Sequence, residues 1–213
     1  MEFEFTSSWL RPRRVAAVGV ANLSTDPIAR FAHRNDAVGM SFSNPSRPDD
    51  ILLPIVVSQD DKRLNDDTIR TRLAGPVVVV YQHKRKWMTG DSDLGDMTLQ
   101  ELHEEAIANL ERAVGGLELD PMAGCVIPKL NGKIETSLLL HGRLCAEVAD
   151  RLGGGQLLAI AACEGGLIFA TTDSGGERNL YPMAEVLVDQ MGEPIEPGII
   201  LRAIGFGEWR ADD

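Results

Sequence analysis

The sequence predicts an α+β protein with antiparallel or mixed sheets and three to five helices packed on one face. Two observations predict this class. Apolar segments of strand length occur in pairs joined by short turns, and amphipathic segments of helical period stand between the pairs. This alternation of β-hairpin and helix in the C-terminal part favours antiparallel layers over a doubly wound parallel sheet, in which a helix follows each strand.

The N-terminal part predicts three strands and one short helix. Ala37–Phe42 has alternating apolar residues, and Ile51–Val57 is an apolar run in which Pro54 favours an edge strand or a strand ending in a turn. Asn65–Leu73 begins with residues that can cap a helix and is followed by Gly-Pro, which predicts a short helix. Val77–Tyr81 contains four consecutive valines, which predicts a central strand buried on both faces.

The clearest helix begins after Thr98. The segment from Thr98 to Glu101 matches a capping box, in which each residue's side chain binds the other's backbone N–H. The apolar residues that follow at helical spacing are Leu99, Leu102, Ala106, Leu110 and Ala113. Gly115 and Gly116 end the helix.

The remaining chain predicts two hairpins and two helices. Asn131-Gly132 predicts a hairpin that joins Val126–Ile127 to Ile134–Leu140. The other expected elements are a helix at 142–152, a hairpin of strands 157–163 and 167–172, a helix at 179–191 and a last strand at 199–204.

Charge divides the chain into two parts, although these parts can form one continuous domain. Residues 1–97 carry 13 Lys and Arg against 13 Asp and Glu, whereas residues 98–213 carry 8 against 19 and so contain the whole net charge of −11. We therefore expect a neutral N-terminal α+β part and an acidic C-terminal α+β part. An acidic surface attracts basic proteins and repels phosphate, so we expect a protein partner and no nucleic acid.

The cysteines and the apolar runs predict a cytoplasmic protein. Cys125, Cys145 and Cys163 are odd in number and have no close pair, which does not fit a disulfide framework or a CxxC metal site. The first residues have no basic segment followed by an apolar core, so we expect no signal peptide. No apolar run approaches the length of roughly 18 residues that a membrane span needs.

The motifs that would bind metals or cofactors are incomplete. His103-Glu104-Glu105 begins like the HExxH zinc helix, but Ile107 stands where the second histidine is required. Asp91, Asp93 and Asp96 lack the spacing of a calcium loop. Three glycines at 153–155 follow a predicted helix, whereas a phosphate loop precedes one. We therefore expect no metal and no cofactor.

Several segments between Pro76 and Ala170 resemble one family. The valine-rich strand from Pro76 to Tyr81, the helix 99–110, Leu138-Leu139-Leu140 and the turn 154–160 are similar in order and type to segments of the uncharacterised bacterial YtpQ-like family. That family has no established activity. The resemblance implies a cytoplasmic bacterial protein with an α+β core, and it transfers no catalytic residue.

The leading hypothesis is a non-enzymatic interaction protein of regulatory, inhibitor or immunity type. It would bind a partner through the acidic face of the helix after Thr98, with Glu104, Glu105 and Glu111 as the partner-binding residues. The alternative is a small hydrolase or transferase in which strand ends bring His83, His141 and Cys145 together as a base and a nucleophile. A purely structural subunit of a homo-oligomer is the third hypothesis.

Overall fold

The computed structural model describes residues 51–130, 134–191, 194–195, 199–205 and 207–212. The strand expected at Ala37–Phe42 and the hairpin turn expected at Asn131-Gly132 lie outside the described residues. The α+β class with antiparallel sheets is confirmed, because two sheets are present and every described strand pair is antiparallel.

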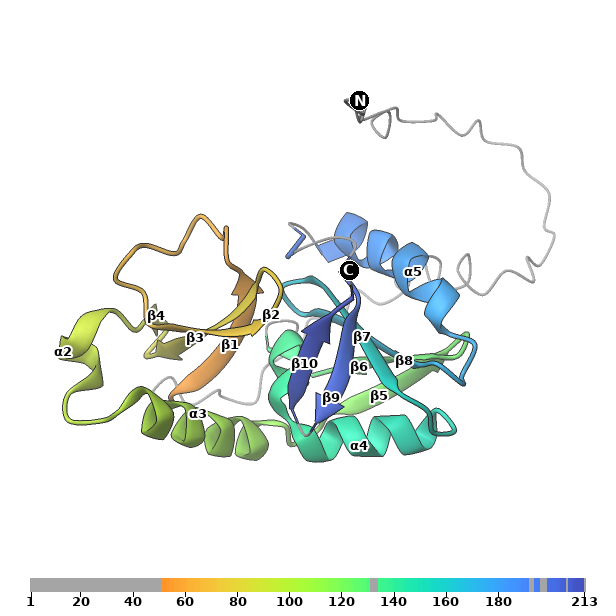
Figure 1. The fold of residues 1–213 in the computed structure, drawn as a ribbon, viewed down its shortest axis with the longest axis horizontal. Helices are drawn as coiled ribbons and strands as arrows, with labels where there is room; N and C mark the ends of the chain where they lie inside the picture. The colour runs from red at the N-terminus through yellow and green to blue at the C-terminus, as the bar shows by residue number, and fades with distance from the viewer. Residues whose placement is uncertain (1–50, 131–133, 192–193, 196–198, 206, 213) are drawn as a thin grey trace, which may run out of the picture.

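The first sheet forms before residue 90 and has the order β1-β3-β2, with β4 paired to β3 (Figure 1). Its strands are β1 (Leu53–Ser58), β2 (Arg70–Ala74), β3 (Val77–His83) and β4 (Lys86–Trp87). The valine run lies in β3 between two neighbours and is buried, as predicted. Among the described strands β1 lies at an edge of this sheet, in keeping with Pro54.

The second sheet has six strands in the order β10-β9-β7-β8-β6-β5. Its strands are β5 (Glu118–Met122), β6 (Cys125–Lys129), β7 (Leu157–Cys163), β8 (Gly166–Thr171), β9 (Leu201–Gly205) and β10 (Glu208–Ala211). The hairpin expected from segments 157–163 and 167–172 is present as β7 and β8.

The described helices divide between the two sheets, and those beside the second sheet cover both of its faces (Figure 1). They are α2 (Gly90–Leu94), α3 (Leu99–Ala113), the 3-10 helix η1 (Glu135–Leu140), α4 (Gly142–Arg151) and α5 (Glu177–Met191). Residues along β7 alternate between two apolar clusters: Leu158 and Ile160 pack with α5, and Leu157 and Ala159 join the core that contains η1 and α4. The helices thus divide between two faces where the sequence led us to expect one, because β7 and β8 are apolar on both faces.

The short helix η1 joins the two sheets. It contacts β1 of the first sheet and both β7 and β8 of the second, and all six of its residues are buried. Thr136 Oγ1 donates a hydrogen bond of 3.4 Å to the carbonyl oxygen of Val56 in β1. This side chain therefore satisfies a main-chain group of β1, which is an edge strand among the described residues.

The helix expected at Asn65–Leu73 is wrong. Asn65 and Thr68 form a closed turn, in which Thr68 Oγ1 donates to Asn65 Oδ1 at 2.9 Å, and the chain then enters strand β2. Backbone pairing of β2 with the valines of β3 outweighs the local helix signal.

The hairpin expected from Val126–Ile127 and Ile134–Leu140 is also wrong, because the second segment forms η1. β6 pairs instead with β5 through a two-residue turn at Ala123-Gly124, where both residues have positive φ, 52° and 79°. The sequence pattern therefore assigned the strand Val126–Ile127 the wrong partner, and β5 was missed because its apolar residues Leu119 and Met122 are three positions apart and do not have the two-residue period of a strand.

Candidate functional site

The capping box at Thr98 is confirmed and fixes where α3 begins. Thr98 Oγ1 accepts from the backbone N–H of Glu101 at 3.2 Å, and Glu101 Oε2 accepts from the backbone N–H of Thr98 at 2.8 Å. The second bond lowers the pKa of the Glu101 carboxyl, because the Thr98 N–H stabilises the ionised form. The start of the helix is therefore set by local chemistry.

The inner face of α3 is anchored on β1. Leu102, Ala106 and Leu110 are fully buried, and Asn109 Nδ2 donates to the carbonyl oxygen of Leu52 at 3.1 Å. Residues at this spacing occupy one side of the helix, so the rotation of α3 about its axis is fixed. The opposite side faces solvent.

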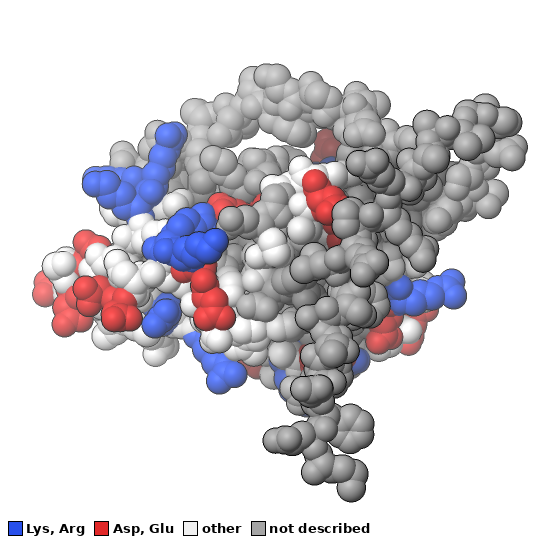
Figure 2. All heavy atoms as spheres, turned by 90° about the horizontal axis from the view of Figure 1, so that it is seen from above, with Lys and Arg blue, Asp and Glu red and all other residues white. Residues whose placement is uncertain are grey.

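The exposed carboxylates of α3 and of the segment before it form what we call the acidic surface. Its residues are Asp91, Asp93, Asp96, Glu104, Glu105 and Glu111, all exposed. Figure 2 shows acidic side chains gathered at the end of the molecule where α2 lies. Among the described Lys and Arg residues, none forms a salt bridge with these six. The three glutamates that the sequence singled out thus lie on one solvated helix whose orientation is fixed by its buried face.

His103 occupies the border between the two sides of α3. Its Nδ1 lies 2.8 Å from the hydroxyl of Tyr81 in β3, and that hydroxyl lies 3.2 Å from Thr71 Oγ1 in β2. Partial burial lowers the pKa of the imidazole, which opposes its protonation, although the charge of Glu104 acts in the opposite direction. Burial raises the pKa of Tyr81, so its hydroxyl keeps its proton.

The series of hydrogen bonds from Thr71 through Tyr81 to His103 allows the imidazole two hydrogen-bonding states. Tyr81 can donate to His103 Nδ1 while it accepts from Thr71, or it can accept from Nδ1–H while it donates to Thr71. In the first state His103 presents an N–H at Nε2, and in the second it presents a lone pair. His103 can therefore donate or accept at Nε2 without losing its internal partner.

The three residues of the Cys/His hypothesis come from two parts of the fold. His83 is exposed at the end of β3 in the first sheet. His141 is buried at the start of α4, where its Nδ1 accepts from the backbone N–H of Leu144 at 3.2 Å. Cys145 follows one turn later on α4.

The surroundings of Cys145 oppose a nucleophilic role. Its thiol is buried and lies 3.6 Å from the carbonyl oxygen of Leu138, and burial raises its pKa to about 12. A catalytic thiol needs a depressed pKa and access to substrate, because the thiolate is the attacking form. The lone pair of His141 Nδ1 is also occupied by the helix cap, so this ring nitrogen cannot accept a proton without breaking that bond.

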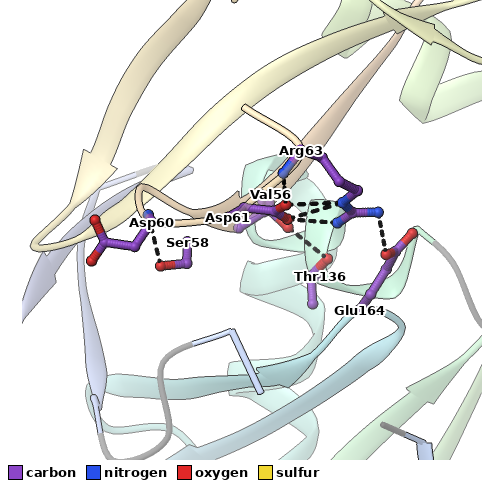
Figure 3. Close-up of polar contacts among 7 residues, drawn as sticks. All are labelled: Val56, Ser58, Asp60, Asp61, Arg63, Thr136 and Glu164. Atoms are coloured by element: carbon purple, nitrogen blue, oxygen red, sulfur yellow. Dashed lines mark hydrogen bonds and ion pairs between the residues drawn. The ribbon is translucent and has the colours of Figure 1, made fainter. Parts of the chain in front are cut away.

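Arg63 ties the loop after β1 to the turn between β7 and β8 (Figure 3). Its guanidinium lies 2.6 Å from Asp61 and 2.8 Å from Glu164, and its Cζ lies 5.3 Å from the centroid of the Trp87 ring. The Arg63 hydrogen bond lowers the pKa of Asp61. Because Arg63 and Glu164 are roughly half exposed, the pair contributes only about 0–1 kcal/mol. The cluster also covers the ring of Trp87.

Within the described part of the chain, no group of three or more His, Cys, Asp or Glu residues is placed to hold a metal ion. Among the described helices, none combines the length and the apolar character that crossing a bilayer requires.

Sequence reasoning missed the support of His103. A tyrosine at the end of a buried valine strand signals that its hydroxyl needs a partner. That signal cannot identify the partner, because Thr71 and His103 lie 10 and 22 residues away on different elements.

A comparison of the chain with protein-family models, curated proteins and solved structures found no match.

Proposed function

We propose that the protein is a non-enzymatic interaction protein that binds a basic protein partner through the acidic surface. The observation that carries the proposal is the combination of exposed carboxylates and a fixed helix: Glu104, Glu105 and Glu111 project from α3, whose inner face is anchored by buried leucines and by Asn109. A surface with one sign of charge on a rigid element attracts and orients an oppositely charged partner. A regulatory, inhibitor or immunity-type role is the form of activity that such binding would serve.

The setting of this function is also a proposal. The resemblance of residues 76–170 to the YtpQ-like family supports a bacterial, cytoplasmic protein. The three cysteines support a reducing compartment, since each is free and buried.

The test compares two triple variants with equal charge change. Glu104→Gln, Glu105→Gln and Glu111→Gln remove three charges from α3, and Glu177→Gln, Glu185→Gln and Asp189→Asn remove three exposed charges from α5 as the control. Partners captured by the wild-type protein are identified and purified, and their affinities are measured at two salt concentrations. The proposal expects a basic partner whose affinity falls with salt and with the α3 variant, but not with the control.

Two results would contradict the proposal. One is equal capture by the wild-type protein and the α3 variant. The other is an equal loss with both triple variants, which would indicate that only the net charge matters. Thermal unfolding of all three proteins checks that the substitutions leave the fold intact.

A further inference from the structure

A cleft separates the two sheets beside His103. It lies between β2, at the edge of the first sheet, and β10, at the edge of the second. These strands meet at their ends, where a Cβ atom added to Gly75 would lie 3.0 Å from the Cβ atom of Ala211. Nearer the start of both strands the cleft has a volume of about 380 Å³, which is within the range of small-molecule sites.

Apolar groups from three elements line the cleft. They are Leu73 of β2, Leu140 of η1, and Ile204 and Trp209 of the β9–β10 hairpin. Trp209 Nε1 donates to the carbonyl oxygen of Leu139 at 2.7 Å, which fixes the indole ring against η1. The hairpin can approach this closely because residue 207 is glycine: its φ is 70°, and a Cβ there would lie 3.1 Å from the Leu140 carbonyl oxygen. The Trp209 hydrogen bond and the close approach at Gly207 thus fix the β9–β10 hairpin against η1.

Two opposite charges face the cleft from its two edge strands. Arg72 of β2 and Glu208 of β10 both line it, and Arg72 also lines the neighbouring hollow with Gln59 and Asp60. Arg72 donates from Nε to the carbonyl oxygen of Gly75 at 3.2 Å, which leaves its two terminal nitrogens for other acceptors. No salt bridge joins Arg72 and Glu208, and within the described residues neither side chain has an ionic partner. A ligand with only one sign of charge would therefore be attracted by one of these two side chains and repelled by the other.

We propose that this cleft binds a small zwitterion with an apolar body, of which an apolar α-amino acid is the simplest form. Its carboxylate would bind the terminal nitrogens of Arg72, and its ammonium group would bind the Glu208 carboxylate. Its side chain would contact Leu140, Ile204 and the Trp209 ring. His103 Nε2, which can donate or accept because of the Tyr81 and Thr71 hydroxyls, forms the third polar contact.

The chain offers a matched control on the same strand. Arg70 lies two residues before Arg72 and is also exposed; both arginines line a second hollow with Gln59 and Asp60, but only Arg72 also lines the cleft beside His103. Arg70→Gln therefore makes the same chemical change as Arg72→Gln outside the proposed site. Glu185→Gln on α5 is the corresponding control for Glu208→Gln.

The experiment titrates the full chain with L-leucine, and with isocaproate and isoamylamine, which carry only the carboxylate or only the ammonium group. Backbone amide chemical shifts are followed up to about 10 mM ligand, tenfold above a dissociation constant of 1 mM. We expect saturable shifts around Leu140 and the β9–β10 hairpin with leucine, and weaker binding of both single-charge analogues. Arg72→Gln and Glu208→Gln should each weaken leucine binding by about 10- to 100-fold, and the two controls should leave it unchanged.

Several outcomes would overturn the proposal. Absence of saturable shifts with leucine, methionine and phenylalanine alike would do so, as would binding that Arg72→Gln and Glu208→Gln leave unchanged. Tighter binding of isocaproate than of leucine would show an anion site in place of a zwitterion site. A fold check by amide spectra of each variant distinguishes loss of the site from loss of the structure.

Discussion

The Tyr81 hydroxyl offers the most direct test of how α3 is connected to the first sheet. Tyr81 is fully buried, and its hydroxyl lies within hydrogen-bond distance of His103 on α3 and Thr71 on β2. Tyr81→Phe keeps the ring and removes only this oxygen. The ring itself packs edge-on against the imidazole at a centroid distance of 6.0 Å, and that contact survives the substitution.

The expected loss follows from the two hydrogen bonds. A typical intramolecular hydrogen bond contributes about 0.5–1.5 kcal/mol net, which gives about 1–3 kcal/mol for two. His103 and Thr71 are only partly buried, so water can replace part of each lost bond. We therefore expect Tyr81→Phe to lower the free energy of unfolding by about 1–2 kcal/mol, or the melting temperature by about 2–8 °C.

A double-mutant cycle isolates the bond to His103. The free energy of unfolding is measured by urea denaturation for the wild type, Tyr81→Phe, His103→Ala and the double variant. We expect a coupling of about 0.5–1.5 kcal/mol between the two positions. Strict additivity would refute this reasoning, because the Tyr81–His103 bond would then contribute nothing that water does not supply.

Three further predictions concern the pH dependence of stability, the reactivity of the buried thiols and the substitution of Gly207, which lines the cleft. Burial lowers the pKa of His103 in the folded protein, so the unfolded state binds the proton more tightly. The stability that His103 contributes is therefore present above the unfolded pKa of about 6.5, and it is lost as pH falls through the folded pKa. Urea titrations of His103→Gln should therefore show a weaker fall in stability below neutral pH than the wild type, and identical slopes would contradict the assignment. The Cys125 and Cys145 thiols, whose pKa values burial raises to about 11 and about 12, should react with a thiol reagent at neutral pH only as fast as the protein opens, so that rapid labelling of either site in the native protein would contradict the structure. Gly207→Ala should destabilise by about 1–3 kcal/mol and more than Gly175→Ala, because the two glycines have nearly the same φ, 70° and 69°, but only at residue 207 would the added Cβ lie 3.1 Å from a carbonyl oxygen. Calorimetric melting of both variants makes the comparison, and equal losses would remove the role of the close approach.

The sequence was informative where local chemistry decides the structure. The Thr98 capping box fixes the start of α3, and the valine run required burial on both faces of β3, so both could be predicted without tertiary information. The errors occurred where distant partners decide. Arg70–Ala74 forms a strand because β3 offers an unpaired edge, and Glu135–Leu140 forms a 3-10 helix because it fills the junction between the sheets. No local pattern contains either partner.

The candidate sites divide in the same way. The exposed glutamates of α3 were predictable, since the period of the helix separates them from the buried leucines. The cleft was not, because Arg72, His103 and Glu208 lie far apart along the chain and meet only where the edges of two sheets approach. In the sequence, His103 beside Glu104 and Glu105 resembled an incomplete zinc motif. In the structure, the relevant feature of His103 is its hydrogen bond with the buried Tyr81 hydroxyl.

The acidic surface and the cleft share α3, so the two proposals must remain separable in experiments. Glu104 belongs to the acidic surface, and its charge raises the pKa of the neighbouring His103, opposing the effect of burial. Glu104→Gln removes this opposing effect, which favours the neutral imidazole further. At pH values above about 7 the imidazole is already neutral in the wild type, so the triple α3 variant should bind leucine as the wild type does while losing its basic partner. If the variant loses both activities above neutral pH, the carboxylates of α3 act on the cleft by a route other than the charge state of His103, and the two surfaces form one site.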